Sequence, residues 1–152
     1  MKWIKIKEKA LTENYVEIHY REVDHEMELL VSYLQKSGIL LGKKDGQVKK
    51  LLADDIFYCE IVDRKCFAYL EQEVWILEPG LQEILSAYEA AGFVRIGKSM
   101  IVNIHKVDRM ESDLNMRVRL YLENGETVIL NRSYRQDFYT RLKKEVERNA
   151  TD

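Results

Sequence analysis

Apolar and polar residues alternate in two short stretches near the start of the chain, at residues 3–7 and 15–20. A period near two is typical of half-buried strands. The next stretch, residues 24–35, changes to helical spacing, with Asp24 in the N-cap position and Gly38 as its stop. Its apolar stripe consists of Met27, Leu30, Val31 and Leu34. The pattern predicts a β-β-α segment that is small for an independent domain.

From Ile39 onward, strand-like stretches are short and follow one another closely. The dipeptides Asp45-Gly46 and Asn124-Gly125 suit tight turns between consecutive strands. The predicted strands are residues 39–43, 47–51, 56–61, 66–70, 73–77, 93–96, 100–102, 107–110, 117–122 and 127–130.

Two stretches in this part of the chain have helical spacing. The first, residues 81–88, follows the only proline, Pro79, and ends at Gly92. The second ends the chain, with Ser133 as its expected N-cap. Its apolar stripe consists of Phe138, Leu142 and Val146.

Closely spaced strands with brief helices between them favour a mainly β, α+β fold over a parallel βαβ sheet. We predict a domain of short antiparallel sheets with a C-terminal helix over residues 39–148. The β-β-α extension over residues 1–38 precedes it. We interpret this extension as a dimerisation or regulatory element, or as a cover for an exposed sheet edge.

The composition is that of a globular chain, with 46% hydrophobic and 33% charged residues. No apolar run approaches the ~18–20 residues that cross a bilayer. The start of the chain alternates Lys with apolar residues and lacks the continuous apolar stretch of a signal peptide. We therefore expect a cytoplasmic protein without membrane insertion.

The formal net charge of −2 argues at first against a nucleic-acid partner, but the charges are unevenly distributed. Residues 46–92 carry four basic and nine acidic side chains, whereas residues 93–152 carry twelve basic and nine acidic ones. Eight of those twelve are Arg. Because Arg binds phosphate and guanine in a bidentate manner, the last third of the chain is the candidate for DNA contact.

Catalytic and metal-binding patterns are sparse. GxGxxG, HExxH and GxSxG do not occur, and the three His residues are scattered along the chain. Cys59 and Cys66 are too far apart for a CxxC motif, and we expect them to be thiols on strands that flank a turn. We predict no enzyme activity, no metal site and no cofactor.

Two joints between predicted elements combine backbone freedom with positive charge. Residues 97–99 (Gly-Lys-Ser) offer a permissive backbone, a point charge and a hydroxyl group. Residues 131–133 (Asn-Arg-Ser) place an Arg beside a predicted helix start, whose free N–H groups suit a phosphate. These groups can hold a DNA backbone and read a base edge. Solvated loop charges and an ordinary helix cap are the alternative interpretation.

The sequences around these joints carry a resemblance to a known family. They read FVRIGKSMIVNIHKVDRM and then LENGETVILNRSYRQDF, and upstream lies DDIFYCEIVDRKCFAYLEQEVWIL. Together they resemble the LytTR DNA-binding domain over about residues 39–146. That family's pattern reads roughly F-x-R-x-x-[KR]-S-x-[IV]-V-N, then N-G-E, then S-R-S-Y before a terminal helix. Asn131 replaces the usual Ser, and Gly97 stands where many members have His, which leaves the base preference open.

The resemblance implies a β-β-β fold of short sheets whose loops enter successive major grooves of duplex DNA. The family's contacting positions fall on a charged hairpin, a central loop and the segment before the last helix. In this chain the implied DNA-binding residues are Arg64 and Lys65, then Lys98 and Ser99, then Arg132, Ser133, Tyr134 and Arg135, with Arg95 beside the central loop.

Two of the residues near these positions, Arg95 and Tyr134, have two interpretations, and Asn103 has a structural one. Arg95 either reaches a phosphate or forms a structural salt bridge. Tyr134 either stacks on a sugar or packs beneath the helix. We expect Asn103 to anchor a turn through hydrogen bonds to the backbone.

The function implied is that of a bacterial-type transcription regulator that binds promoter repeats in double-stranded DNA as a homodimer. Many members carry a receiver domain, but the roughly forty residues ahead of this domain are too few, so we expect a stand-alone member. A regulatory protein partner could dock on the extension. The alternative is a protein-interaction adaptor on the same fold, and RNA binding is a distant third because the aromatic residues fall at core spacing.

Overall fold

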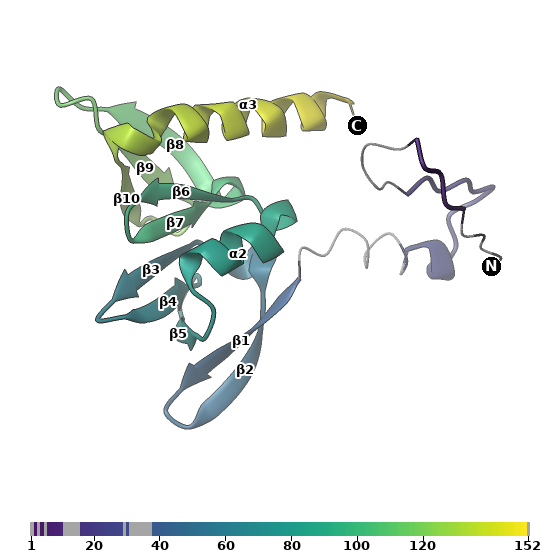
Figure 1. Ribbon diagram of the computed structural model, residues 1–152, viewed down its shortest axis with the longest axis horizontal. Helices are drawn as coiled ribbons and strands as arrows, with labels where there is room; N and C mark the ends of the chain where they lie inside the picture. The colour runs from purple at the N-terminus through teal and green to yellow at the C-terminus, as the bar shows by residue number, and fades with distance from the viewer. Residues whose placement is uncertain are drawn as a thin grey trace. The chain divides into compact units, whose positions relative to one another are not determined.

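The computed structural model describes residues 2, 4, 6–10, 16–28, 30 and 38–151 (Figure 1). The chain divides into two compact units, Met1–Gln35 and Lys36–Asp152, each treated by itself below. Within the described part of the chain, no helix is both long enough and apolar enough to span a membrane.

In the first unit, the predicted strand over residues 15–20 is wrong for the residues that are described, since 16–20 form no strand. Val16 is 70% exposed, so burial of its apolar side chain does not stabilise a strand here. Residues 4, 6 and 7 of the other predicted strand, over residues 3–7, also form no strand. The end of the predicted helix, residues 31–35, lies outside the described part. The predicted helix cap is confirmed, because the Asp24 Oδ1 accepts a hydrogen bond from the Met27 N–H at 2.8 Å.

The second unit contains a seven-stranded antiparallel sheet in the order β2-β1-β5-β4-β3-β7-β6. The turns predicted from the sequence lie between consecutive strands, and Asp45 and Gly46 both have the positive φ that such tight turns require. The strands are β1 (Ile39–Lys44), β2 (Gln47–Leu52), β3 (Tyr58–Val62), β4 (Lys65–Tyr69), β5 (Val74–Leu77), β6 (Phe93–Gly97) and β7 (Met100–Asn103).

A second antiparallel sheet has three strands in the order β10-β9-β8. They are β8 (Val107–Ser112), β9 (Val118–Leu122) and β10 (Thr127–Leu130). Helix α2 (Leu81–Ala87) lies against the large sheet, and α3 (Arg135–Thr151) runs along β6 and the small sheet (Figure 1). The mainly β fold with antiparallel sheets and a C-terminal helix is therefore confirmed.

The start and the buried face of α3 differ from the prediction. Ser133 does not cap the helix, because it lies inside a 3-10 turn, η4 (Arg132–Tyr134), and the N-cap position belongs to Asn131. Val146 is 61% exposed, whereas Glu145 is buried. Phe138 is fully buried, as predicted.

Two hydrophobic cores stabilise the second unit, and β6 and β7 contribute to both. Successive side chains on a strand point to opposite faces. Phe93 and Ile101 accordingly pack in the core under α2, while Val94 and Val102 pack in the core between the large sheet, the small sheet and α3. Strands buried on both faces explain the nearly continuous apolar runs in this part of the sequence.

Candidate nucleic-acid interface

The three cationic joints lie next to one another along one edge of the second unit. The Ile61 N–H, near the end of β3, donates to the Ser99 carbonyl at 2.8 Å. The Asn131 N–H donates to the Ile96 carbonyl, at the end of β6, also at 2.8 Å. Two backbone hydrogen bonds thus connect the hairpin turn after β3, the loop between β6 and β7, and the segment before α3. We call this series, residues 62–65, 97–99 and 131–135, the joint edge.

The first joint is a tight turn whose two central residues have left-handed backbone conformations. Asp63 has φ 49° and Arg64 has φ 65°. A two-residue turn of this kind matches the twist of a hairpin but usually contains Gly or Asn. Both side chains are exposed, as is that of Lys65 at the start of β4. The turn therefore presents the Arg64 guanidinium at the tip of the hairpin, at a cost in backbone energy.

In the second joint, Lys98 and Ser99 are exposed between two buried strands. Among the described residues, Arg95 forms no salt bridge. Its Nη1 donates to the Lys98 carbonyl at 2.9 Å, so Arg95 braces the loop that carries Lys98. This contact adds to the phosphate contact that the resemblance predicts for Arg95, which stays a prediction.

Residues 92–99 read GFVRIGKS and match the spacing GxxxxGK[ST] of nucleotide-binding P-loops. A P-loop requires a strand, a phosphate-cradling loop and then a helix. Here residues 93–97 form β6 itself, and Met100 begins the next strand of the same sheet. The backbone N–H groups of this segment belong to a strand-turn-strand, so the match does not indicate a nucleotide site.

Asn103 anchors the far end of β7, as predicted. Its Nδ2 donates to the Ile56 carbonyl at 3.1 Å, and its Oδ1 accepts from the His105 N–H at 3.0 Å. The side chain is 1% exposed. Because both ends of its amide are used inside the protein, Asn103 stabilises the strand that holds Ser99 and is not available to DNA.

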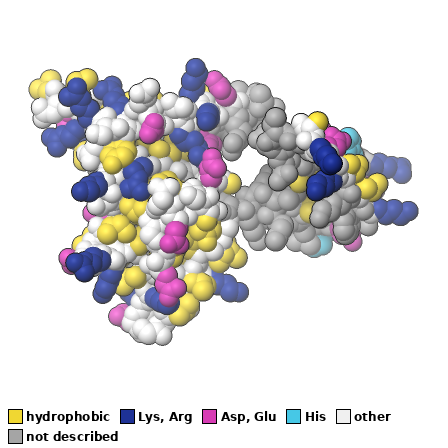
Figure 2. Space-filling view, in the orientation of Figure 1, with side chains coloured by type: hydrophobic (Ala, Val, Ile, Leu, Met, Phe, Trp, Pro, Cys, Tyr) yellow, Lys and Arg dark blue, Asp and Glu magenta, His cyan; other side chains and the backbone are white. Residues whose placement is uncertain are grey.

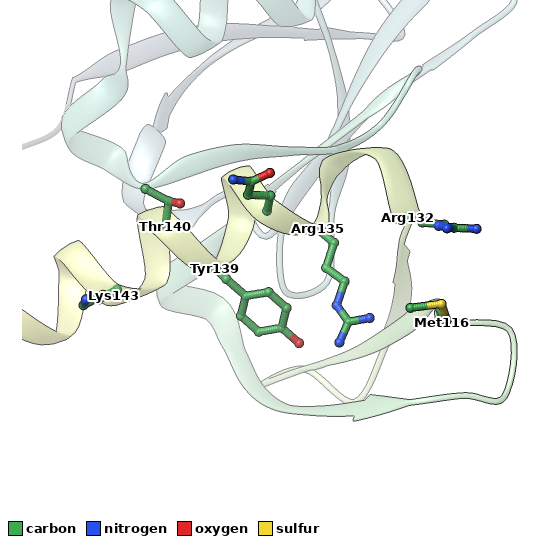
Figure 3. Close-up of a pocket in the computed structure, with 7 residues that line it drawn as sticks. Met116, Arg132, Arg135, Tyr139, Thr140 and Lys143 are labelled. Carbon is green, nitrogen blue, oxygen red and sulfur yellow. The ribbon is translucent and has the colours of Figure 1, made fainter.

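In the third joint, the 3-10 turn leads directly into α3 and exposes cations beside a hollow of about 560 Å³ (Figure 3). The Arg135 guanidinium carbon lies 5.6 Å from the centre of the Tyr139 ring, a cation–π distance. No carboxylate is among the described residues that line the hollow. They are Met116, Arg132, Arg135, Gln136, Tyr139, Thr140 and Lys143.

Lys143 is a candidate contact that sequence reasoning missed. Arg135, Tyr139 and Lys143 are spaced four residues apart along α3, so all three share one face of the helix. The i, i+4, i+8 spacing was visible in the sequence. Figure 2 shows Lys and Arg side chains gathered near the end of the unit where the β8–β9 turn lies.

Tyr134 packs rather than stacks outward. It is half-buried against the core shared by the small sheet and α3, and its N–H donates to the Asn131 carbonyl at 3.0 Å. Ser133 is exposed beside it. The segment before α3 thus has Tyr134 as its internal anchor and the Arg side chains at its surface.

Residues Gly97 and Asn131, the two departures from the family pattern, meet in the structure. A Cβ atom on Gly97 would lie 3.2 Å from the Asn131 Nδ2, closer than an ordinary contact. Both residues line a second hollow, of about 520 Å³, together with Lys98 and Ser99. Tyr58 and Glu60 on β3 also line it.

Tyr58 lines this second hollow with a phenol group that stays protonated. Its ring stacks on Tyr69 with the centroids 4.2 Å apart. Burial, followed by the neighbouring Glu126 carboxylate, raises the pKa of Tyr58 well above its ordinary value. The phenol therefore adds no negative charge to the joint edge near neutral pH.

The second unit thus consists of short antiparallel sheets whose turns present Arg and Lys along one edge, and comparisons identify the family. A model of the family described as the LytTr DNA-binding domain matches residues 46–143. This chain belongs to that family, and DNA binding is accordingly its function.

Individual relatives and one solved structure agree with this assignment. An uncharacterized HTH-type transcriptional regulator of Staphylococcus aureus strain MSSA476 is 27% identical over 134 residues, which cover 86% of this chain and 90% of the relative. A regulator with the same description from strain NCTC 8325 is 25% identical with the same coverage. The LytTr DNA-binding domain of a methyl-accepting/DNA response regulator from Bacillus cereus superimposes with a TM-score of 0.65, at 24% identity, covering 68% of this chain and 95% of that one.

Proposed function

We propose that this protein is a transcriptional regulator that recognises specific sequences in double-stranded DNA through the joint edge. The observation that carries the proposal is the adjacency of the three joints, which the Ile61–Ser99 and Asn131–Ile96 backbone hydrogen bonds hold in series. Rigid strands behind each joint fix the positions of the cations before DNA arrives, which lowers the entropic cost of binding.

The chemistry of the joints suggests a division of roles. Arg64 and Arg132 carry planar guanidinium groups suited to bidentate contact with guanine in the major groove. Lys98, Ser99 and the cations around the hollow of α3 suit phosphate oxygens, which position a protein on DNA and make affinity depend on salt. Three turns along one edge, entering successive major grooves, would bind one face of the duplex.

The proposal extends to assembly and location. We infer a homodimer in the cytoplasm that binds paired promoter repeats, because a single small domain reads few base pairs and two copies double the contacts. The first unit, Met1–Gln35, is the proposed dimerisation or regulatory element. The relatives in Staphylococcus aureus are named as transcriptional regulators, and this chain matches them over nearly their full length. Both facts support the regulatory role.

The test is titration of labelled promoter fragments from the protein's own upstream region, with scrambled competitor, at ~50 and ~200 mM salt. Tight, salt-sensitive binding that survives the competitor is expected. Arg132→Ala should weaken it at least ~10-fold through loss of a base contact. The matched control is Arg109→Ala, since Arg109 is an exposed arginine on β8 that belongs to none of the joints.

Two results would contradict the proposal. Weak binding that the competitor abolishes would favour a protein-interaction adaptor on the same fold. Equal losses for Arg132→Ala and Arg109→Ala, with both variants folded, would remove Arg132 from the interface.

A further inference from the structure

We propose that Asn131 reads an adenine base and sets part of the sequence preference of this protein. The inference rests on the proposed function, because it assigns a base contact within the joint edge. Asparagine forms two hydrogen bonds with adenine in the major groove, from its amide N–H to N7 and from the adenine N6–H to its carbonyl oxygen.

The backbone of Asn131 is held firmly in place. Its N–H donates to the Ile96 carbonyl at 2.8 Å, and its carbonyl accepts from the Tyr134 N–H at 3.0 Å. The residue has an extended conformation, φ −72° and ψ 150°, immediately before the 3-10 turn. Fixed backbone on both sides sets the direction of the Cα–Cβ bond, so the amide stays within reach of one region of the joint edge.

The side chain of Asn131, by contrast, forms no hydrogen bond with the residues that the structure describes. Residues in this position usually cap the following turn through their side chains, and Asn131 makes no such hydrogen bond. The residue is exposed. Its amide therefore retains both the donor and the acceptor that adenine would engage, in contrast to Asn103, whose amide is fully occupied and buried.

The Asn131 amide is where the third joint meets the second. A Cβ atom added to Gly97 would lie 3.2 Å from the Asn131 Nδ2. The same hollow of about 520 Å³ is lined by Lys98 and Ser99. A base edge that entered this hollow would meet Asn131 and Lys98, and its amino group could also face Glu60 on the same lining. A larger residue at position 97 would occupy the space, so Gly97 and Asn131 function as a pair.

The experiment uses the full-length protein and a pool of duplexes with a randomised core. Selection with the wild type should enrich a motif that contains one adenine dependent on Asn131. In Asn131→Ala, preference for that adenine should fall about 10-fold while the other positions of the motif remain. Replacing that adenine with 7-deazaadenine, which lacks N7, should weaken the wild type and leave Asn131→Ala unchanged.

Two further variants separate base reading from a structural effect. Gly97→Ala keeps the amide but adds the Cβ that presses on it, so preference at the same base pair should change. Gln72→Ala removes an exposed amide beyond the far end of β4, away from the charged hairpin, and should change nothing. Thermal unfolding of each variant checks that the fold is retained.

The outcomes distinguish the two proposals. If no motif is enriched, sequence-specific recognition itself fails. If a motif is enriched but Asn131→Ala retains every base preference, or if 7-deazaadenine weakens the wild type and Asn131→Ala equally at every adenine, Asn131 reads no base and only this inference is overturned.

Discussion

Glu145 is a buried carboxylate that ties the last helix to the rest of the domain. It accepts a hydrogen bond from the Arg141 Nε at 2.9 Å and lies 3.6 Å from the His105 Nε2. Arg141 in turn donates through its Nη2 to the Glu89 carbonyl, beyond the end of α2, at 2.6 Å. These contacts attach α3, whose first residue is Arg135, to the segment after α2 and to His105.

We predict that Glu145→Gln lowers the free energy of unfolding by about 2 kcal/mol, because a nearly isosteric amide leaves the Arg141 charge without a counterion in a half-buried site. Urea denaturation would measure the change. Glu83→Gln, at an exposed position on α2, is the control and should alter stability by less than about 0.5 kcal/mol. Equal stabilities of the two variants would show that the pair contributes little.

Tyr58 should make the fold sensitive to alkaline pH. Its pKa is raised in the folded state by burial and by Glu126, so the folded protein holds the phenolic proton more tightly than the unfolded chain does. As the pH rises above about 10, the unfolded chain loses this proton first and stability falls. Melting temperatures at pH 8 and pH 10.5 should therefore differ less for Tyr58→Phe than for the wild type. An unchanged difference would mean that Tyr58 titrates normally.

At the scale of elements, the hairpin between β3 and β4 is less stable than it would be with glycine at its turn, because an Arg occupies that position. Arg64 has the left-handed backbone conformation that glycine adopts without cost. We predict that Arg64→Gly raises the free energy of unfolding by about 1 kcal/mol. The same change should weaken DNA binding at least ~5-fold through loss of the guanidinium.

The Arg64→Gly variant should therefore be more stable than the wild type and bind DNA more weakly. Chemical denaturation and DNA titration on the same preparation would measure both. Arg64→Asn, which also tolerates a positive φ, should behave like the Gly variant. A loss of stability in both variants would indicate that the Arg64 side chain contributes packing to the folded state.

Helix α3 should contact the DNA backbone through one face only. Lys143 and Lys144 are both exposed, but only Lys143 lines the hollow beside Arg132 and Arg135. We predict that Lys143→Gln weakens specific and non-specific binding alike and lowers the slope of log affinity against log salt by about one. Lys144→Gln, an identical charge change one residue further on, should leave the slope unchanged. Equal slopes for the two variants would exclude this face of α3 from the interface.

The elements could be predicted to a large extent, and their juxtaposition could not. Alternation and the Asp-Gly and Asn-Gly turns locate each of the ten strands that the described residues 38–151 form, because each strand depends on local residues. The apolar pattern places Val146 in the core, but the buried residue is Glu145, which contacts Arg141 and His105. A periodic pattern contains no information about these partners. Local alternation also predicted a strand over residues 15–20, where the described residues form none.

The candidate site could be proposed in part from the sequence. The resemblance names its candidate cations, but the contact between Gly97 and Asn131 depends on how β6 meets the segment after β10. The role of Arg95 depends on the shape of the loop that it braces. Such contacts between residues distant in sequence depend on the order of strands in the sheet, and a local sequence pattern does not predict that order.

At the scale of the whole molecule, both hydrophobic cores are built from residues of the second unit. We predict that a fragment starting at Lys36 unfolds cooperatively, with a melting temperature within a few degrees of the full chain. Calorimetry would measure this. If the first unit provides the dimer interface, sedimentation analysis should find the full chain dimeric and the fragment monomeric. A dimeric fragment would place the interface in the second unit.

The joint edge is assembled from widely separated parts of the chain, because the Asn131–Ile96 hydrogen bond joins its last member to β6. The proposed reading surface is therefore complete only when the chain has been made through Arg135. Removal of the segment from Asn131 onward also takes Phe138 out of its core and leaves the Ile96 carbonyl without its hydrogen bond. Loss of folding and loss of DNA binding are therefore expected together in a chain that is truncated there.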